Sequence, residues 1–253
     1  MNCAAVEDQI VNWLKNFGAR GYVVGISGGV DSSCTSTLCA KTGLPLICVS
    51  LPIHQPASHS ERANKHMNWL EKTYPNVISF TVDLTNIFET FKKDIPPEAS
   101  SDLAHVNARS RLRMITLYNF ANSYGYLVAG TGNKVEDFGI GFFTKYGDGG
   151  VDISPIGDLL KSEVREISKH LGVCDEIILA PPTDGLWADD RSDEDAIGAS
   201  YDELEWAMKY YTEKQIDDVI ISARQREVLT IYLNRHRNNL HKMNMPQICK
   251  VTK

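Results

Sequence analysis

The sequence predicts an α/β protein built on a doubly wound parallel sheet, with a helical C-terminal extension. Strand-like apolar runs alternate with segments of helical periodicity over residues 21–129, which is typical of βαβ units. A glycine-rich turn follows the first predicted strand, and a longer glycine-rich segment follows the last. Ligands of such sheets bind beyond the carboxyl ends of the strands, so we expect both glycine-rich segments at one edge.

Each element is placed by the spacing of its apolar residues. Ala63, Met67 and Leu70, for example, recur at helical intervals and predict an amphipathic helix over 58–74. The expected order is a helix over about 4–17, a strand over 21–26, a helix over 31–41, a strand over 45–51, the helix over 58–74, a strand over 77–82, a long helix over 105–124 and a strand over 126–129.

No strand pattern recurs from Pro181 on. This part of the chain is predicted to be loop and helix, with helices over 201–211 and from 213 to about 240. The sequence contains no internal repeat, low-complexity tract or clear linker. We therefore expect residues 1–253 to form one domain, in which about 181–253 are a helical extension.

The composition is ordinary for a soluble globular protein, because 43% of the 253 residues are hydrophobic and 23% are charged. No run approaches the ~18 apolar residues of a membrane helix, and the N-terminus lacks a signal peptide, so we expect a cytoplasmic protein that binds no membrane. The net charge of −6 argues against nucleic-acid binding. The six cysteines contain no Cys-x-x-Cys pair, and most are expected to be reduced core residues.

Residues 22–33, Tyr-Val-Val-Gly-Ile-Ser-Gly-Gly-Val-Asp-Ser-Ser, are the most informative segment. Gly28 and Gly29 allow a sharp turn that brings bare N–H groups against an anion, and the following helix points its positive end at the same place. A carboxylate at Asp31 would repel phosphates unless a cation lay between them, and Mg²⁺ is the usual one. The segment is predicted to bind nucleotide phosphates; the alternative is an ordinary strand-to-helix turn.

Residues 129–155 are rich in glycine with interspersed Thr, Lys and Asp, a composition that indicates a ligand-binding loop. Flexible surface loops are also rich in glycine, and such a loop is the alternative. The expected position of this segment, at the sheet edge that carries the phosphate loop, favours ligand binding.

These motifs resemble those of a known family. Ser-Gly-Gly-x-Asp-Ser at 27–32 resembles the pyrophosphate loop of N-type ATP pyrophosphatases, and it is not a Walker A loop because it has no lysine. Gly-Thr-Gly-Asn-Lys-x-Glu at 130–136 and Gly-Phe-Phe-Thr-Lys-Tyr-Gly-Asp-Gly-Gly at 141–150 resemble the signature of NAD synthetases. The resemblance continues, in the same order, at 107–114, 156–161, 182–183, 193–194, 201–204 and 241–242.

The resemblance implies an adenine nucleotide alpha hydrolase-like, Rossmann-like fold and an ATP- and Mg²⁺-dependent amidation of deamido-NAD by ammonia. In that reaction the nicotinate carboxylate attacks the α-phosphorus of ATP, pyrophosphate leaves, and ammonia displaces AMP to give NAD. Glutamine-using relatives carry an additional amidohydrolase domain for which this chain has no room, so the ammonia-dependent form is expected. The family also implies a homodimer, in which the C-terminal segment reaches the substrate of the partner.

The resemblance further implies roles for individual residues. Asp31 and Glu136 are expected to hold Mg²⁺ and, with Lys161, to form the catalytic set. The expected ATP-binding residues are Gly25, Ile26, Ser27, Gly28, Gly29, Val30, Asp31, Ser32, Thr131, Lys161 and Thr183. The expected deamido-NAD-binding residues are Arg111, Lys145, Asp152, His241 and Lys242.

Several of these assignments have alternatives. Arg113 is the second choice to Arg111, and residues 241–242 could instead be a polar tail. Asp137 is expected to be solvated, and the acidic segment 187–195 is either a solvated loop or a lid that orders over the nucleotide. Lys145 follows Glu136 by nine positions, one more than in some members of the family, and the extra residue is placed around 138–140.

Two other functions are open from the sequence alone. Another N-type ATP pyrophosphatase would share the phosphate loop and adenylate a different acceptor, but it would lack the motif at 142–150. A non-catalytic nucleotide-binding protein of the same fold would not need two carboxylates for a metal ion. Retention of both features favours the amidating enzyme.

Overall fold

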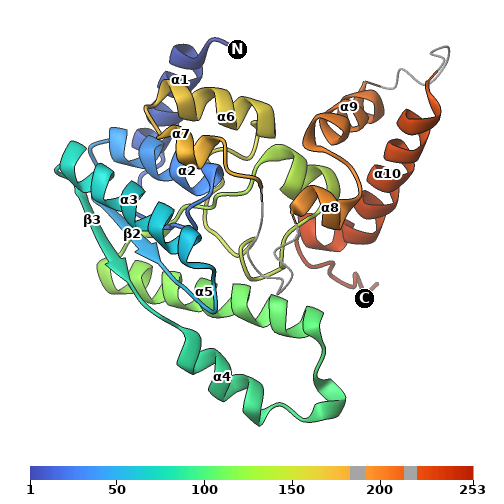
Figure 1. Ribbon diagram of the computed structural model, residues 1–253, viewed down its shortest axis with the longest axis horizontal. Coiled ribbons are helices and arrows are strands. Elements are labelled where there is room, and N and C mark those ends of the chain that lie inside the picture. Colours follow the sequence, from blue (N-terminus) through green and yellow to red (C-terminus); the bar gives the residue numbers. More distant parts are fainter. Residues whose placement is uncertain (183–191, 214–220, 253) are drawn as a thin grey trace.

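The computed structural model describes residues 1–182, 192–213 and 221–252, and it confirms an α/β fold with a helical C-terminal segment (Figure 1). The elements, in chain order, are α1 (Cys3–Asn16), β1 (Tyr22–Gly25), α2 (Val30–Lys41), β2 (Leu46–Ser50), α3 (Ala57–Thr73), β3 (Val77–Thr81), α4 (Thr85–Asp94), the 3-10 turn η1 (Pro97–Ala99), α5 (Asp102–Tyr124), β4 (Leu127–Val128), the π-helical turn η2 (Lys134–Ile140), α6 (Lys161–His170), α7 (Asp175–Ile178), α8 (Asp193–Ile197), α9 (Tyr201–Thr212) and α10 (Ala223–Met243).

The four strands form a parallel sheet in the order β3-β2-β1-β4. Tyr22 of β1 pairs with Leu46 of β2 on one side and with Leu127 of β4 on the other. A parallel bridge between Ala129 and Ile153 extends the pairing past β4. Because all four strands are parallel, their carboxyl ends meet at one edge, which confirms the expectation for the two glycine-rich segments.

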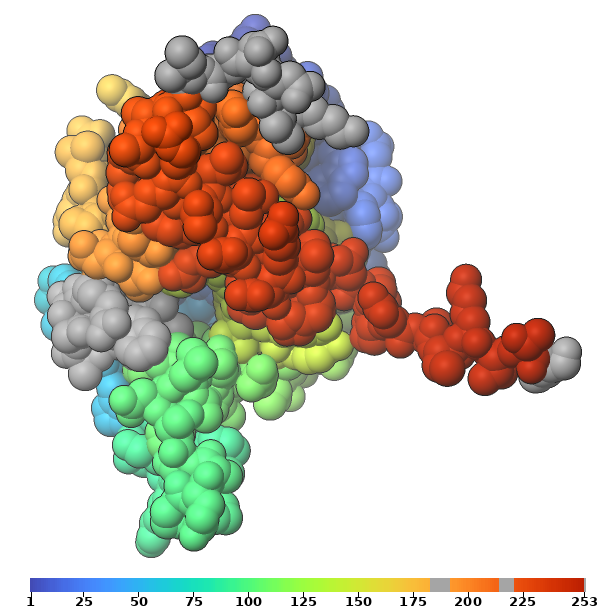
Figure 2. Space-filling view, turned by 90° about the vertical axis from the view of Figure 1, so that its right-hand side faces the viewer, coloured from blue at the N-terminus to red at the C-terminus, as the bar shows by residue number. Residues whose placement is uncertain are grey.

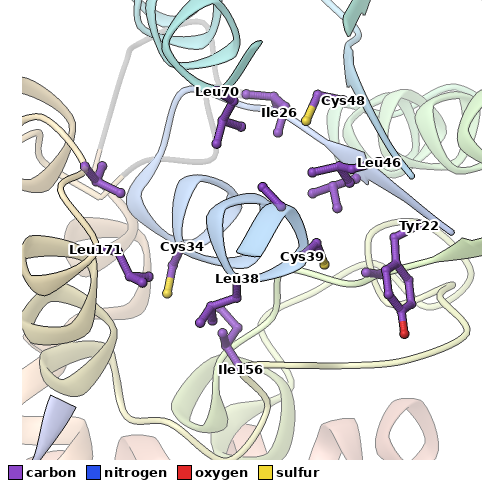
Figure 3. Packing of buried hydrophobic residues seen from close by; sticks show 14 of the residues in the cluster. Tyr22, Ile26, Cys34, Leu38, Cys39, Leu46, Cys48, Leu70, Ile156 and Leu171 are labelled. Carbon is purple, nitrogen blue, oxygen red and sulfur yellow. The ribbon is translucent and has the colours of Figure 1, made fainter. Parts of the chain in front are cut away.

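Alternation along the strands divides the interior into two cores, one on each face of the sheet. Tyr22 and Val24 face a core completed by α1, α2, α3 and α6, part of which Figure 3 shows. Val23, between them, faces the opposite core, which α4 and α5 cover. Cys34, Cys39 and Cys48 are buried in the first core, and burial raises the pKa of the Cys34 thiol to about 12, as expected for inert core cysteines.

The C-terminal helices form a third core, and this core surrounds η2 rather than the sheet. Val135 and Ile140 of η2 pack with Tyr201 and Leu204 of α9 and with Tyr232 of α10. Figure 1 shows α8, α9 and α10 gathered beside the sheet layers, and Figure 2 shows residues 244–252 projecting from the body. In the three described stretches no helix is long and apolar enough to cross a membrane.

The boundaries of most predicted elements are confirmed to within a few residues, and the differences have local causes. The long helix begins at Asp102 rather than 105 because the Ser101 hydroxyl caps it, accepting from Ala104 N at 3.2 Å. The last predicted helix is confirmed as α10, but its predicted start at 213 was wrong. Glu213 is the C-cap of α9, and α10 begins after Ser222, whose capping box with Gln225 closes at 2.8 and 3.1 Å. No bounds were predicted for α4, α6, α7 or α8.

His66 of α3 gives the fold a pH dependence. Its side chain is buried and its Nε2 lies 2.9 Å from Ser36 Oγ, and burial lowers its pKa to about 4. The unfolded chain, with a histidine pKa of about 6.5, binds the proton first, so stability is full above pH 6.5 and falls as the pH drops toward 4. Glutamine does not titrate, so we expect the free energy of unfolding of His66→Gln to fall less on acidification than that of the wild type, by up to about 3 kcal/mol. Urea unfolding of both proteins at pH 7 and pH 4.5 measures this difference. An equal fall in the free energy of unfolding between the two pH values would contradict the prediction.

Candidate active site

A cavity of about 600 Å³ opens at the carboxyl edge of the sheet. The two glycine-rich segments meet there, because residues 25–32 line one wall and residues 128–131 line another. Side chains of α5, α6 and α10 complete the lining. The expected ATP-binding residues of the first loop, together with Thr131 and Lys161, therefore lie around one cavity, whereas Thr183 lies outside the described residues.

The phosphate loop is held in shape by its own hydroxyl groups. Ser27 Oγ accepts from Gly29 N at 3.2 Å and lies 3.1 Å from Ser32 Oγ. Ser32 Oγ donates to the Gly29 carbonyl at 3.0 Å. Gly28 has a positive φ of 85°, and a Cβ there would meet the His59 carbonyl oxygen of α3, so no other residue fits without a shift. The loop thus presents the N-terminus of α2 to the cavity, which is a favourable position for an anion.

The second loop carries Glu136 on the π-helical turn η2. The Asn133 side chain accepts from Val135 N at 3.2 Å and from Glu136 N at 3.1 Å, and this fixes the start of the turn. A π-helical turn holds one residue more than an α-helical turn, and such turns are frequent at functional sites. Residues 138–140, where the extra residue was predicted, belong to this wider turn, which ends at Gly141 in the left-handed conformation.

Lys161 joins the two carboxylates that the sequence analysis assigned to a metal ion. Its Nζ donates to Asp31 Oδ2 at 2.6 Å and to Glu136 Oε1 at 2.9 Å, and its side chain is only 5% exposed. Burial alone would lower the pKa of Lys161, but Asp31 and Glu136 more than offset this and raise it. The carboxylates also explain how a lysine is tolerated in the first turn of α6, where the helix dipole disfavours a cation.

Tyr201 of α9 completes this cluster from the C-terminal helical core. Its hydroxyl donates to the same Glu136 Oε1, and its ring lies 4.8 Å from Lys161 Nζ. Burial and the neighbouring Glu136 raise the pKa of Tyr201 well above its ordinary value, so the hydroxyl stays a donor. Glu136 Oε1 therefore accepts from both an ammonium and a phenol.

The donor set suits Mg²⁺. Asp31 and Glu136 both contact a single cationic atom, so their oxygens can share one ion. In the described ranges no group of three or more His, Cys, Asp or Glu side chains is arranged to hold a metal ion. Proteins usually contribute one or two carboxylates to a magnesium–nucleotide site, and phosphate oxygens and water occupy the remaining coordination positions.

Asp137 corrects a prediction in part, because its side chain is partly buried rather than fully exposed to solvent. The side chain packs against the backbone of Gly132, which has no Cβ to obstruct it. Burial first, and then the nearby Glu136 and Asp148, raise the pKa of Asp137 well above its usual range. No local pattern could have predicted this, since a charged residue in a glycine-rich loop is most often exposed.

Side chains of α10 bind the carbonyl groups at the end of η2. His236 Nδ1 donates to the Gly139 carbonyl at 2.6 Å and Asn239 Nδ2 donates to the Ile140 carbonyl at 2.8 Å. Lys242 Nζ donates at 2.9 Å to the carbonyls of both Gly141 and Phe143. These contacts satisfy backbone acceptors that a helix end leaves unpaired. Lys242 lines the cavity of its own chain, where its ammonium is bound to the carbonyls of Gly141 and Phe143, and its expected contact with deamido-NAD stays a prediction.

Three of the expected deamido-NAD-binding residues lie together outside the cavity. Arg111 Nε and Nη2 each donate to the Lys145 carbonyl at 3.3 Å, and Lys145 Nζ donates to the His241 carbonyl. Asp152 does not join them, because its carboxylate accepts from Val128 N at 2.8 Å and from the Tyr118 hydroxyl at 3.1 Å. Arg113, the second choice to Arg111, lines the cavity and donates to the Leu51 carbonyl at 2.9 Å.

Sequence reasoning missed three residues of the site. Asn133 carries a signal that could have revealed it, since Asn directly before a helical turn is a common cap. Arg62 of α3 lines the cavity and its Nε donates to the Gly28 carbonyl at 3.2 Å, but only the packing of α3 brings it there. Tyr201 is 65 positions from Glu136, so no local pattern connects them.

Comparisons with known proteins give matches over nearly the whole chain, in sequence and in structure. The sequence model described as NAD synthase matches residues 2–246. The NH3-dependent NAD+ synthetase of Methanococcoides burtonii is 36% identical over 260 residues, which cover 98% of this chain and 95% of that protein. Two solved structures are similar over 99% of this chain and 100% of theirs. They are the NMN synthetase of Francisella tularensis, with 30% identity and a TM-score of 0.86, and the NH3-dependent NAD synthetase of Campylobacter jejuni, with 25% identity and a TM-score of 0.78.

Proposed function

The chain belongs to the NAD synthase family, and from that premise we propose that it catalyses the ATP-dependent amidation of deamido-NAD by ammonia, with NAD, AMP and pyrophosphate as products. One observation carries the proposal beyond family membership. Lys161 bridges Asp31 of the phosphate loop and Glu136 of the second loop at the wall of a cavity of about 600 Å³. That arrangement supports the proposal, because an adenylating enzyme needs a cationic group for the triphosphate and carboxylates for its metal ion, and all three line one cavity.

The protein supplies charge and position rather than a nucleophile. The substrate carboxylate oxygen would form a bond to the α-phosphorus while the bond to the pyrophosphate oxygen breaks. Ammonia would then attack the acyl carbon, and AMP would leave with the carboxylate oxygen. The N-terminus of α2 and the Ser27 and Ser32 hydroxyls would hold the phosphates, and Lys161 would neutralise charge on them.

We assign Asp31 and Glu136 as the residues that would hold Mg²⁺. When bound, the ion would neutralise the charge that develops on the departing pyrophosphate. Tyr201 would fix the orientation of Glu136, since its hydroxyl donates to the carboxylate from the buried side. Side chains of α10 would keep the segment that carries Glu136 in place through the carbonyls of 139–143.

An end-point assay with ATP, Mg²⁺, deamido-NAD and ammonium tests the proposal by measuring NAD, AMP and pyrophosphate together. Equal amounts of the three products, formed from ammonium and poorly from glutamine, would support it. AMP and pyrophosphate without NAD would redirect the search to another acceptor. Absence of ATP cleavage with every acceptor would favour a non-catalytic nucleotide-binding protein.

The similarity to an NMN synthetase favours a second candidate, the same amidation on nicotinate mononucleotide. That structure has the higher TM-score of the two, 0.86 against 0.78. The acceptors differ by an adenylate half, so the assay includes both, and the ratio of their kcat/KM values decides between them. A ratio that favours the mononucleotide would move the chain to the second candidate.

Lys145 provides a test of where the acceptor binds. Because Lys145 lies with Arg111 and His241 outside the ATP cavity, we expect Lys145→Ala to raise the KM for deamido-NAD about tenfold and to leave the KM for ATP nearly unchanged. Lys134→Ala is the matched control, since Lys134 pairs with exposed Asp158 at 2.8 Å. An equal rise in both KM values would remove Lys145 from the acceptor site.

We also propose that the chain forms a homodimer and acts in the cytoplasm, as the sequence predicts. Exposed apolar residues on α4 and α5, among them Ile87, Leu103 and Ile115, support an interface on that side of the protein. Light scattering of the purified protein would give the mass of the assembly.

A further inference from the structure

Asn133 is completely buried and its amide serves both ligand loops at once. Nδ2 donates to Asp31 Oδ1 at 3.0 Å, across 102 positions of sequence. Oδ1 accepts from the N–H groups of Val135 and Glu136 at 3.2 and 3.1 Å. One side chain thus connects the carboxylate of the first loop to the turn that carries the carboxylate of the second.

The two ends of the amide cannot be exchanged. A flipped amide would place its NH2 against two N–H donors and its oxygen against the Asp31 carboxylate, and both contacts would be repulsive. Aspartate at this position would keep the acceptor end but would oppose Asp31 with a second anion. Serine can accept from the N–H groups of a helical turn, but its hydroxyl is too short to serve Asp31 as well. Only an amide of this length satisfies all three partners.

The contact with Asp31 divides its two oxygens between two partners. Oδ1 accepts from Asn133, whereas Oδ2 accepts from Lys161 at 2.6 Å. Without the amide, Asp31 could rotate and give both oxygens to Lys161. The carboxylate would then present neither oxygen in a fixed direction to another cation.

We infer that Asn133 is a positioning residue for the proposed Mg²⁺ site, because it fixes the direction of the Asp31 carboxylate relative to Glu136. The inference rests on the proposed function for the identity of the cation and the nucleotide. Groups that orient metal ligands typically contribute tenfold to a hundredfold in metal affinity, so the effect is measurable.

Two substitutions separate the two ends of the amide. Asn133→Ser keeps an acceptor for the turn and loses the donor to Asp31, whereas Asn133→Ala loses both. Asn76→Ser is the matched control, because Asn76 Nδ2 donates to the Ala40 and Leu44 carbonyls at 3.0 and 2.7 Å, away from the cavity lining. For each protein we would measure the melting temperature, the Mg²⁺ concentration that gives half the maximal rate, and Mn²⁺ binding by electron paramagnetic resonance with a non-hydrolysable ATP analogue.

We expect Asn133→Ser to melt close to the wild-type temperature, to need about tenfold more Mg²⁺ and to bind Mn²⁺ about tenfold more weakly. Saturating Mg²⁺ should restore most of its rate. Asn133→Ala should show the same change in metal affinity and also a lower melting temperature, and Asn76→Ser should change only the melting temperature.

The inference would be overturned if Asn133→Ser bound the metal within twofold of wild type. It would also be overturned if the loss of rate paralleled the loss of melting temperature and saturating Mg²⁺ did not restore the rate. A wild-type protein that binds Mn²⁺ about tenfold more tightly than Asn133→Ser but converts neither acceptor would reject the proposed function and keep the inference. A wild-type protein that binds no Mn²⁺ even with the nucleotide analogue would overturn the inference as well.

Discussion

Replacement of Asp31 by Asn is expected to lower the rate of NAD formation by at least about a thousandfold while the fold is retained. Asparagine has the shape of the aspartate and its oxygen can still accept from Asn133, whose Nδ2 donates at 3.0 Å. It has no charge, however, so it would neither hold Mg²⁺ well nor pair with Lys161, whose Nζ now lies at 2.6 Å. A defect of this size corresponds to several kcal/mol of transition-state stabilisation.

Initial rates of AMP formation at saturating ATP and Mg²⁺ measure this effect, and the circular dichroism spectrum and melting temperature establish that the fold is intact. Asp158→Asn is the matched control, because the Asp158 side chain is 95% exposed and pairs only with Lys134 among the described ion pairs. A rate for Asp31→Asn within tenfold of wild type would remove Asp31 from the catalytic set.

Lys161→Met is expected to reduce both the rate and the stability. The ammonium contacts Asp31 at 2.6 Å and Glu136 at 2.9 Å, and its removal would leave two neighbouring, largely buried carboxylates without their cation. Loss of one partner from a buried ion pair costs about 3–5 kcal/mol, and we expect the free energy of unfolding at pH 7 to fall by that amount. We expect the rate to fall at least about a hundredfold, because the phosphates would lose a fixed positive charge.

The pH dependence of this contribution has a definite sign. The folded-state pKa of Lys161 is raised, so its stabilising effect is fully present below the unfolded-state pKa of about 10.4 and is lost only as the pH rises through the folded-state value. Urea unfolding at pH 7 therefore measures the full effect. Lys134→Met, at an exposed ion pair, should change the free energy of unfolding by less than about 1 kcal/mol. A change below 1 kcal/mol for Lys161→Met would show that the carboxylates do not need it.

The parts of the site that lie close together in the sequence could be predicted. The strand, the glycine pair and the serines of the phosphate loop occur within twelve residues, and the structure holds them as a loop at the N-terminus of α2. The parallel sheet could be predicted too, because each strand is a short apolar run between helical segments. Both the phosphate loop and the sheet could be predicted from local sequence patterns, since neither prediction depends on a contact between distant residues.

The parts that depend on tertiary packing could not be predicted. Asp137 is partly buried because Gly132 leaves room for its carboxyl group, and no sequence rule links those two positions. Tyr201 reaches Glu136 only because α9 packs on η2 in a third core. Asp152 was grouped with Arg111 and Lys145 by family resemblance, yet the structure places its carboxylate on the backbone of β4. Each of these facts requires knowledge of which segments become neighbours.

The contacts between α10 and the end of η2 also determine the order in which the two loops of the site can form during synthesis. The ribosome delivers the N-terminal part first, and the last strand of the sheet is complete at Val128. The carbonyls of residues 139–143, however, receive their donors from positions 236, 239 and 242. About a hundred further residues must therefore leave the ribosome before the loop that carries Glu136 is fixed. A nascent chain can assemble its nucleotide-binding loop early, but the second carboxylate of the site is fixed only after α10 has been made.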